Sequence, residues 1–106
     1  MSETPLLDTL ADMTAASLER AGLVDRELML VRVAALAAVG APPASYLLNL
    51  GAASEVGLTL EDVQGVLVAV APITGGPKVV AASGAIFKAL GFAMDVLEDE
   101  AGADTD

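Results

Sequence analysis

Cysteine, histidine and tryptophan are all absent from this sequence of 106 residues. Without cysteine the chain forms no disulfide and has no thiol nucleophile, and without cysteine and histidine it lacks the usual ligands of zinc. Serine–histidine–aspartate triads and histidine general bases are excluded for the same reason. The most common catalytic groups are therefore missing, and we expect neither a metal ion nor a cofactor.

Basic residues are also scarce, since five lysines and arginines stand against fifteen acids and give a net charge of −10. So few scattered positive charges do not offset the repulsion from a phosphate backbone, which argues against nucleic-acid binding. An anionic membrane surface repels the chain in the same way.

Long apolar runs are missing too. A membrane-spanning helix needs about 20 apolar residues, whereas the best run, residues 28–39, is twelve long and contains Arg32. Residues 66–87 are broken by prolines, glycines and a lysine. Glu3 and Asp8 do not fit a signal peptide. We therefore expect no membrane span and a cytoplasmic location.

Small aliphatic residues are what the chain has in excess: 55% of it is hydrophobic, even without counting ten glycines. Typical domains reach about 45–50% with glycine included, and a single domain of this size buries only about 60–65% of its unfolded surface. One copy therefore has more apolar side chain than it can hide. We expect a homo-oligomer, with the excess forming subunit contacts.

The spacing of apolar residues predicts five helices. The first runs from Leu6 to Gly22, and the second, capped by Asp25, is apolar on all sides of residues 28–39 except at Arg32. A helix that is apolar all round is buried all round, so the second helix is expected to be central.

Glycines, prolines and a capping box set the limits of the other three helices. The third begins at Pro42 or Pro43 and ends at Gly57; Thr59 and Asp62 open the fourth, which ends near residue 72; the fifth covers about residues 77–97. We thus expect an all-α domain over residues 6–97, between a disordered N-terminus (1–5) and an acidic disordered tail (98–106).

Gly84 and Gly91 lie inside the predicted fifth helix, on a face of small residues that also carries Ala81. Each such glycine costs about 1 kcal/mol relative to alanine. We attribute both to close contact with another helix and expect Gly84→Leu to weaken assembly more than helix content.

The order of these signals resembles a known family. The signals are Arg26-Glu27-Leu28 before an apolar helix, then Gly57-Leu58-Thr59 with Glu61-Asp62-Val63, and then the turn Ala71-Pro72-Ile73-Thr74-Gly75-Gly76-Pro77. Together they resemble the carboxymuconolactone decarboxylase family, which includes the alkylhydroperoxidase-D proteins, over residues 18–97. The resemblance implies an all-helical fold, assembly as trimers or hexamers, and sites between helices near subunit contacts.

The resemblance also locates the family's reactive groups. The Cys-x-x-Cys of the redox branch falls on Pro42 and Ser45, its histidine falls on Asn49, and its glutamate is matched by Glu27. Because only the glutamate is present, the comparison argues against peroxidase or disulfide-reductase activity. The decarboxylase branch also carries a histidine at the position of Asn49, so its mechanism is not retained in full.

Five residues are candidates for a site, each with a structural alternative. Arg32 is a candidate for holding a carboxylate, or else forms an ion pair or extends its stem to water. Glu27 is a candidate proton acceptor, or else complements the helix dipole. Tyr46 and Asn49 are one turn apart and share a face of the third helix, and with Ser45 they are candidates to line a small pocket, or else they pack on the helix surface.

Three functions are compatible with these residues, and the sequence leaves open whether the protein is an enzyme. The first is a non-catalytic or small-molecule-binding oligomeric domain without thiol redox chemistry. The second is a cofactor-free decarboxylase, lyase or isomerase acting on a small carboxylate or lactone, with Arg32 binding the anion and Glu27 moving the proton. The third is an adaptor that acts through the acidic tail.

Overall fold

The computed structural model describes the backbone of residues 3–104 and, within that range, the side chains other than those of residues 50, 92–93 and 95–104. In this range the chain forms helices and no strand: α1 (Pro5–Arg20), α2 (Asp25–Val39), α3 (Pro43–Glu55), α4 (Leu60–Thr74) and α5 (Gly76–Asp104). The prediction of an all-α domain with five helices is confirmed.

Three helix limits differ from the sequence prediction. The N-cap of α2 is Val24 and not Asp25, which lies in the first turn and complements the dipole instead. Helix α4 includes Pro72 and ends at Thr74, because a proline in the last turn removes only one helical hydrogen bond. Helix α5 continues beyond residue 97 to Asp104, through a segment with no proline and with its first glycine at 102.

Gly40 and Gly57 are two of the four glycines with a positive φ, a conformation that L-residues avoid, and they end α2 and α3. Gly40 (φ 71°) follows α2, and the next amide, that of Ala41, donates to the carbonyl of Leu36 at 3.0 Å. Gly57 (φ 81°) follows α3, and the amide of Leu58 donates to the carbonyl of Ala53 at 3.0 Å. Both ends are Schellman-type stops, so the chain turns sharply after α2 and after α3.

Helices α2 to α5 pack together, with α5 against α2, α3 and α4. Helix α2 buries Leu28, Met29, Val33 and Ala37 on one side, which makes it a main contributor to the core. A second cluster joins Tyr46 of α3 to Ile86 and Ala89 of α5, with Leu36, Val63 and Leu67 packed against it. The core is small, as expected for a chain this short.

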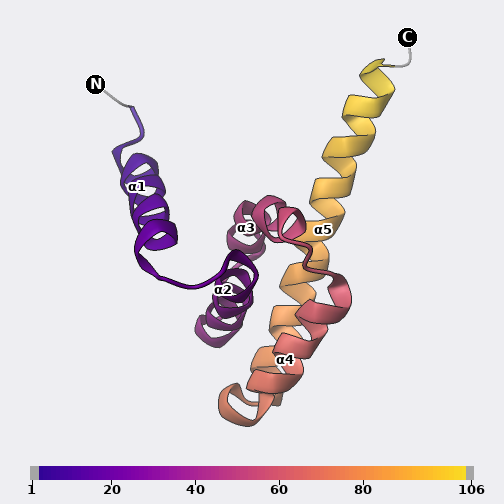
Figure 1. Cartoon of the computed structure of the whole chain (residues 1–106). Helices are drawn as coiled ribbons and strands as arrows, with labels where there is room; N and C mark the ends of the chain where they lie inside the picture. The colour runs from indigo at the N-terminus through magenta and orange to yellow at the C-terminus, as the bar shows by residue number, and fades with distance from the viewer. Residues whose placement is uncertain (1–2, 105–106) are drawn as a thin grey trace.

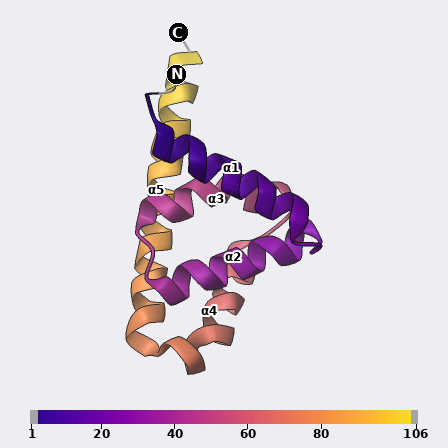
Figure 2. The ribbon, with the colours of Figure 1, turned by 90° about the vertical axis from the view of Figure 1, so that its left-hand side faces the viewer.

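Helix α1 lies apart from this bundle, joined to α2 by residues 21–24 (Figure 1). Figure 2 views the molecule from the side of α1, which passes in front of α3. None of the residues of α1 is buried, although Leu6, Leu10 and Met13 share one of its sides. The apolar side of α1 is therefore left largely exposed by its own chain.

Within the described residues, no helix combines the length and the apolar character that crossing a membrane requires.

Candidate ligand-binding site

A cavity of about 300 Å³ lies where α1, α2 and α3 approach one another. One side of α2 forms most of its wall, because residues three, four and seven positions apart share a helix face. Helices α1 and α3 contribute one residue each, and the complete lining is Thr14, Arg32, Ala35, Leu36, Val39 and Asn49. The cavity is open to solvent, and Thr14, Ala35 and Val39 of its lining are exposed.

Arg32 is the charged residue of the cavity, and its side chain is half-buried. One guanidinium nitrogen, Nη2, donates to Ser17 Oγ at 3.1 Å and to the carbonyl oxygen of Thr14 at 3.5 Å. No carboxylate pairs with Arg32 among the described residues. Since a guanidinium has five N–H donors, those on Nη1 and Nε remain available to an acceptor in the cavity.

Asn49 faces Arg32 from α3, and its position is fixed by its own helix. Its Nδ2 donates to the carbonyl of Ser45, one turn earlier, at 2.8 Å. This bond orients the amide and leaves its oxygen and its second N–H for a ligand. Two of the residues proposed from the sequence, Arg32 and Asn49, are thus brought to one cavity.

Glu27 is not part of this lining. It is exposed in the first turn of α2, five residues before Arg32, which places the two side chains about 140° apart around the helix. In the part of the chain that the structure describes, Glu27 has no hydrogen-bond or ion-pair partner. A single copy therefore does not place this carboxylate beside the guanidinium.

Ser45 and Tyr46 also lie outside the cavity lining. Ser45 contributes its carbonyl to Asn49, whereas Tyr46 is 3% exposed and packs on Ile86 and Ala89. The Tyr46 hydroxyl has no hydrogen-bond partner among the described residues. Burial raises the pKa of this phenol above its ordinary value, so Tyr46 stays neutral at physiological pH.

The cavity includes residues that the sequence analysis did not select. Thr14 lines it, and Ser17 holds the arginine, although both come from α1. A signal was present, because both hydroxyl residues lie within the apolar face of α1 beside Leu10 and Met13. Two polar residues on an otherwise apolar helix face indicate that a polar group from elsewhere meets that face.

The fold and the cavity together define the protein as a small helical domain with an arginine-centred pocket and no thiol or imidazole. The sequence model of the carboxymuconolactone decarboxylase family matches residues 4–88, which is most of the chain. The protein belongs to this family. No curated protein and no solved structure matches it in the corresponding searches.

Proposed function

We propose that this family member binds a small organic carboxylate at Arg32 and carries out no thiol redox chemistry. The observation that carries the proposal is the guanidinium itself, which lines a cavity of about 300 Å³ with no acid paired to it among the described residues. A half-buried charge without a counter-ion is costly, and a bound carboxylate would supply the missing charge.

The rest of the lining supports the same ligand class. Ala35, Leu36 and Val39 offer an apolar wall, while Asn49 and Thr14 offer neutral hydrogen-bonding groups. The carboxylate would accept from the free guanidinium N–H groups, and an aliphatic or aromatic body would lie along α2. The net charge of −10 repels anions from the protein as a whole. The attraction for a carboxylate must therefore come from Arg32 itself, at short range.

Decarboxylation or isomerisation is less well supported than binding. Both reactions need a group that gives or takes a proton at the ligand. Among the polar residues of the cavity, Arg32, Thr14 and Asn49, none readily gives or takes a proton near neutral pH. Glu27 does not line the cavity, because it lies on another side of α2. We therefore favour binding over catalysis. An adaptor function would depend on the acidic tail (residues 98–106), whose side chains lie outside those that the structure describes.

We also propose that the protein works as a homo-oligomer, a trimer or a hexamer. A helix of 16 residues is marginal alone and gains its stability from packing an apolar face. Helix α1 buries none of its residues, and Val31, Val39 and Leu48 of the bundle are exposed as well. A second copy would cover such surfaces. A molar mass equal to one chain in light scattering, at high protein concentration, would contradict this part.

The binding proposal is tested by calorimetric titration with benzoate and succinate, and with neutral benzamide for comparison. We expect at least one carboxylate to bind and benzamide not to. Arg32→Gln should remove charge-assisted hydrogen bonds of about 1.5–3 kcal/mol, which corresponds to about a ten- to hundredfold loss of affinity. Arg32→Lys should lose less, because it keeps the charge but not the planar pair of donors.

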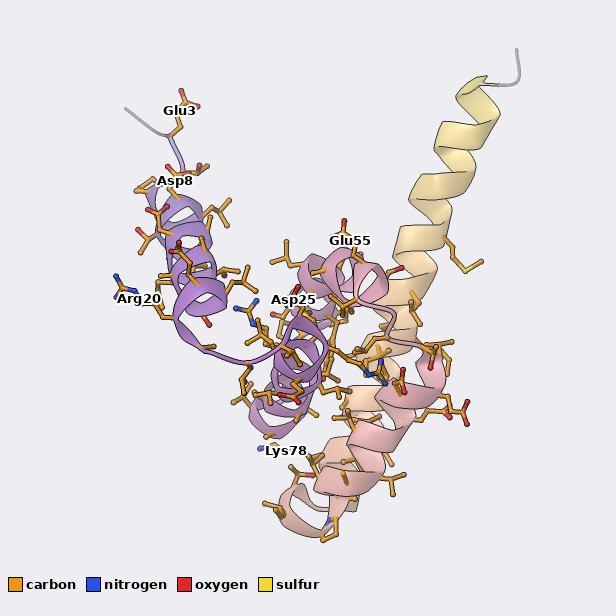
Figure 3. The ribbon with its side chains drawn as sticks, in the orientation of Figure 1. Glu3, Asp8, Arg20, Asp25, Glu55 and Lys78 are labelled. Carbon is orange, nitrogen blue, oxygen red and sulfur yellow. The ribbon has the colours of Figure 1, made fainter. Side chains whose placement is uncertain are left out.

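Arg20→Gln is the matched control. It removes the same charge from the last turn of α1, where Arg20 is exposed and points away from the other helices (Figure 3). If Arg20→Gln weakens carboxylate binding as much as Arg32→Gln does, the effect is one of net charge and the site is wrongly placed. If neither carboxylate binds the unmodified protein, the proposal is overturned.

A further inference from the structure

The outer side of α5 is apolar where a helix at the edge of a protein is normally polar. Ala82, Ile86 and Ala89 are the residues that α5 buries against the other helices. On the opposite side, Val80, Phe87 and Met94 are 72%, 62% and 61% exposed. In Figures 1 and 2 alike, α5 forms one edge of the molecule.

The exposed residues follow a strict spacing of seven. Val80, Phe87 and Met94 form one line along α5, and Gly84 and Gly91 form a second line beside it. A repeat of seven is the spacing at which two helices stay in contact along their length. Large residues in one line and glycines in the next also give the protrusions and the hollows that a closely packed helix pair needs.

The two glycines are not explained by packing within the chain. A Cβ atom at Gly84 or Gly91 would meet no atom within 4 Å. Glycine therefore brings no contact inside one copy, while it lowers the stability of the helix. Gly51 and Gly65 of the other helices have the same open space. What distinguishes Gly84 and Gly91 is the line of exposed large residues beside them, along which a second helix could approach the backbone of α5 closely.

Charge decides between the two directions in which a second α5 can lie. From Gly76 to Met94 the helix carries Lys78 and Lys88 and no acid, whereas residues 95–104 contain five acids and no base. Parallel helices would set the two acidic ends side by side, where they repel, whereas antiparallel helices place the two acidic ends far apart. The same arrangement brings acids level with the N-terminus of α5, which has no acid in its own first turn.

We propose that two copies of this chain pair through the outer faces of antiparallel α5 helices, about a twofold axis near Phe87. In this register Phe87 meets its counterpart and Val80 lies opposite Met94, while Gly84 lies opposite Leu90, one residue before Gly91. The contact is isologous, since each copy offers the same face. This pairing rests on the homo-oligomer proposed above and specifies one of its contacts.

Because the chain has no cysteine of its own, single cysteines report this register directly under mild oxidation. Phe87→Cys is expected to form a covalent dimer by itself. Val80→Cys and Met94→Cys are each expected to cross-link weakly alone and strongly when mixed. Val68→Cys, on the exposed side of α4, measures random collision.

Several results would overturn the proposal. Efficient cross-linking of Val80→Cys to itself, with no gain on mixing with Met94→Cys, would mean a parallel pair. Capture of Phe87→Cys by Leu10→Cys would mean that α1 of a second copy covers this face. Cross-linking of all variants at the level of Val68→Cys would mean that no partner lies there.

A second experiment uses a variant that leaves Val80, Phe87 and Met94 unchanged. Gly84→Leu fills the hollow that the partner would occupy, and sedimentation should show an assembly of half the mass, or single chains, at unchanged helix content. Gly65→Leu is the matched control, because Gly65 of α4 also has open space around it. An unchanged mass for Gly84→Leu, or an equal loss for Gly65→Leu, contradicts the pairing.

Discussion

Arg26 of α2 and Asp62 of α4 form a salt bridge in which Nη2 lies 2.9 Å from Oδ1. Arg26 also donates from Nη1 to the carbonyl of Gly57, at 3.4 Å, where α3 ends. Asp62 in turn accepts from the amide of Thr59 at 2.9 Å, as part of the capping box of α4. One ion pair therefore connects the start of α2, the end of α3 and the start of α4.

The pH dependence of stability should reflect this salt bridge. The hydrogen bond from Arg26, followed by that from the Thr59 amide, lowers the pKa of Asp62 from 3.8 to about 2. A carboxyl whose pKa is lowered by folding stabilises the fold above its unfolded value, and this stabilisation is lost as the pH falls towards 2. We expect unfolding, followed by circular dichroism, to become easier between about pH 4 and pH 2.

Asp62→Asn should make stability less dependent on pH in that window. Glu61→Gln is the control, because Glu61 is a neighbouring acid in the same first turn and has no hydrogen-bond or ion-pair partner among the described residues. An equal change in slope for both variants would show that the general acidity of the chain, and not the Asp62 contacts, causes the effect.

The capping box itself is expected to contribute measurably to stability. The amide of Asp62 donates to Thr59 Oγ1 at 3.1 Å, and Thr59→Ala would leave that helix-end amide without its partner. The expected loss is about 0.5–2 kcal/mol in urea unfolding, and Thr59→Ser should restore most of it. If Thr59→Ser is as unstable as Thr59→Ala, the methyl group matters and the hydrogen bond does not.

Gly40 and Gly65 should respond in opposite ways to alanine. Gly40 has a φ of 71°, so Gly40→Ala forces a left-handed residue at a cost of about 1–2 kcal/mol. The nearest atom to the new Cβ, Cε of Lys78, is 3.8 Å away, so the strain lies in the backbone and not in a clash. Gly65 lies within α4 with open space around it, so Gly65→Ala should stabilise by about 0.5–1 kcal/mol.

Thermal unfolding at one protein concentration measures both glycine variants. A stable Gly40→Ala protein would mean that α2 can end in another conformation. Destabilisation by Gly65→Ala would mean that something outside the chain occupies the space beside α4.

The helices could be predicted from the sequence because the residues that begin and end a helix act on their immediate neighbours. Gly57 and the Thr59–Asp62 box act within a few residues of their own position, and the structure uses both as expected. Asp25 was misplaced by one position because its carboxylate suits a cap and a first turn equally well. The prediction that the fifth helix ends at about residue 97 was wrong, because an acidic segment without proline can continue a helix, and α5 runs to Asp104.

The candidate site could be predicted only in part from the sequence, because it depends on contacts between helices. Arg32 stood out as a charge within an apolar helix, and Asn49 was placed by the family resemblance. Thr14 and Ser17 were not selected, because their role follows from the direction in which α1 leaves α2. Tyr46 is three residues before Asn49, yet it packs into the core while Asn49 lines the cavity, so helix spacing alone could not separate them.

Tyr46 provides the last prediction, because it is the one tyrosine of a chain without tryptophan. Its ultraviolet absorbance therefore reports one phenol. Burial raises its pKa above 10.0, so the native protein should ionise at a higher pH than the same protein in denaturant. A pKa raised by folding gives stability that is present below pH 10 and is lost as the pH rises through the folded value. An identical titration in both states would place the hydroxyl in water.

Tyr46→Phe removes the hydroxyl and keeps the ring against Ile86 and Ala89. A buried hydroxyl without a partner costs about 1–3 kcal/mol, and the Tyr46 hydroxyl is such a group among the described residues. We therefore expect Tyr46→Phe to be at least as stable as the unmodified protein in urea. Its stability should also no longer fall as the pH rises above 10. A variant that is clearly less stable would mean that the hydroxyl has a partner from a second copy or a bound molecule. Equal carboxylate affinity in both proteins would place Tyr46 in the core and outside the Arg32 cavity.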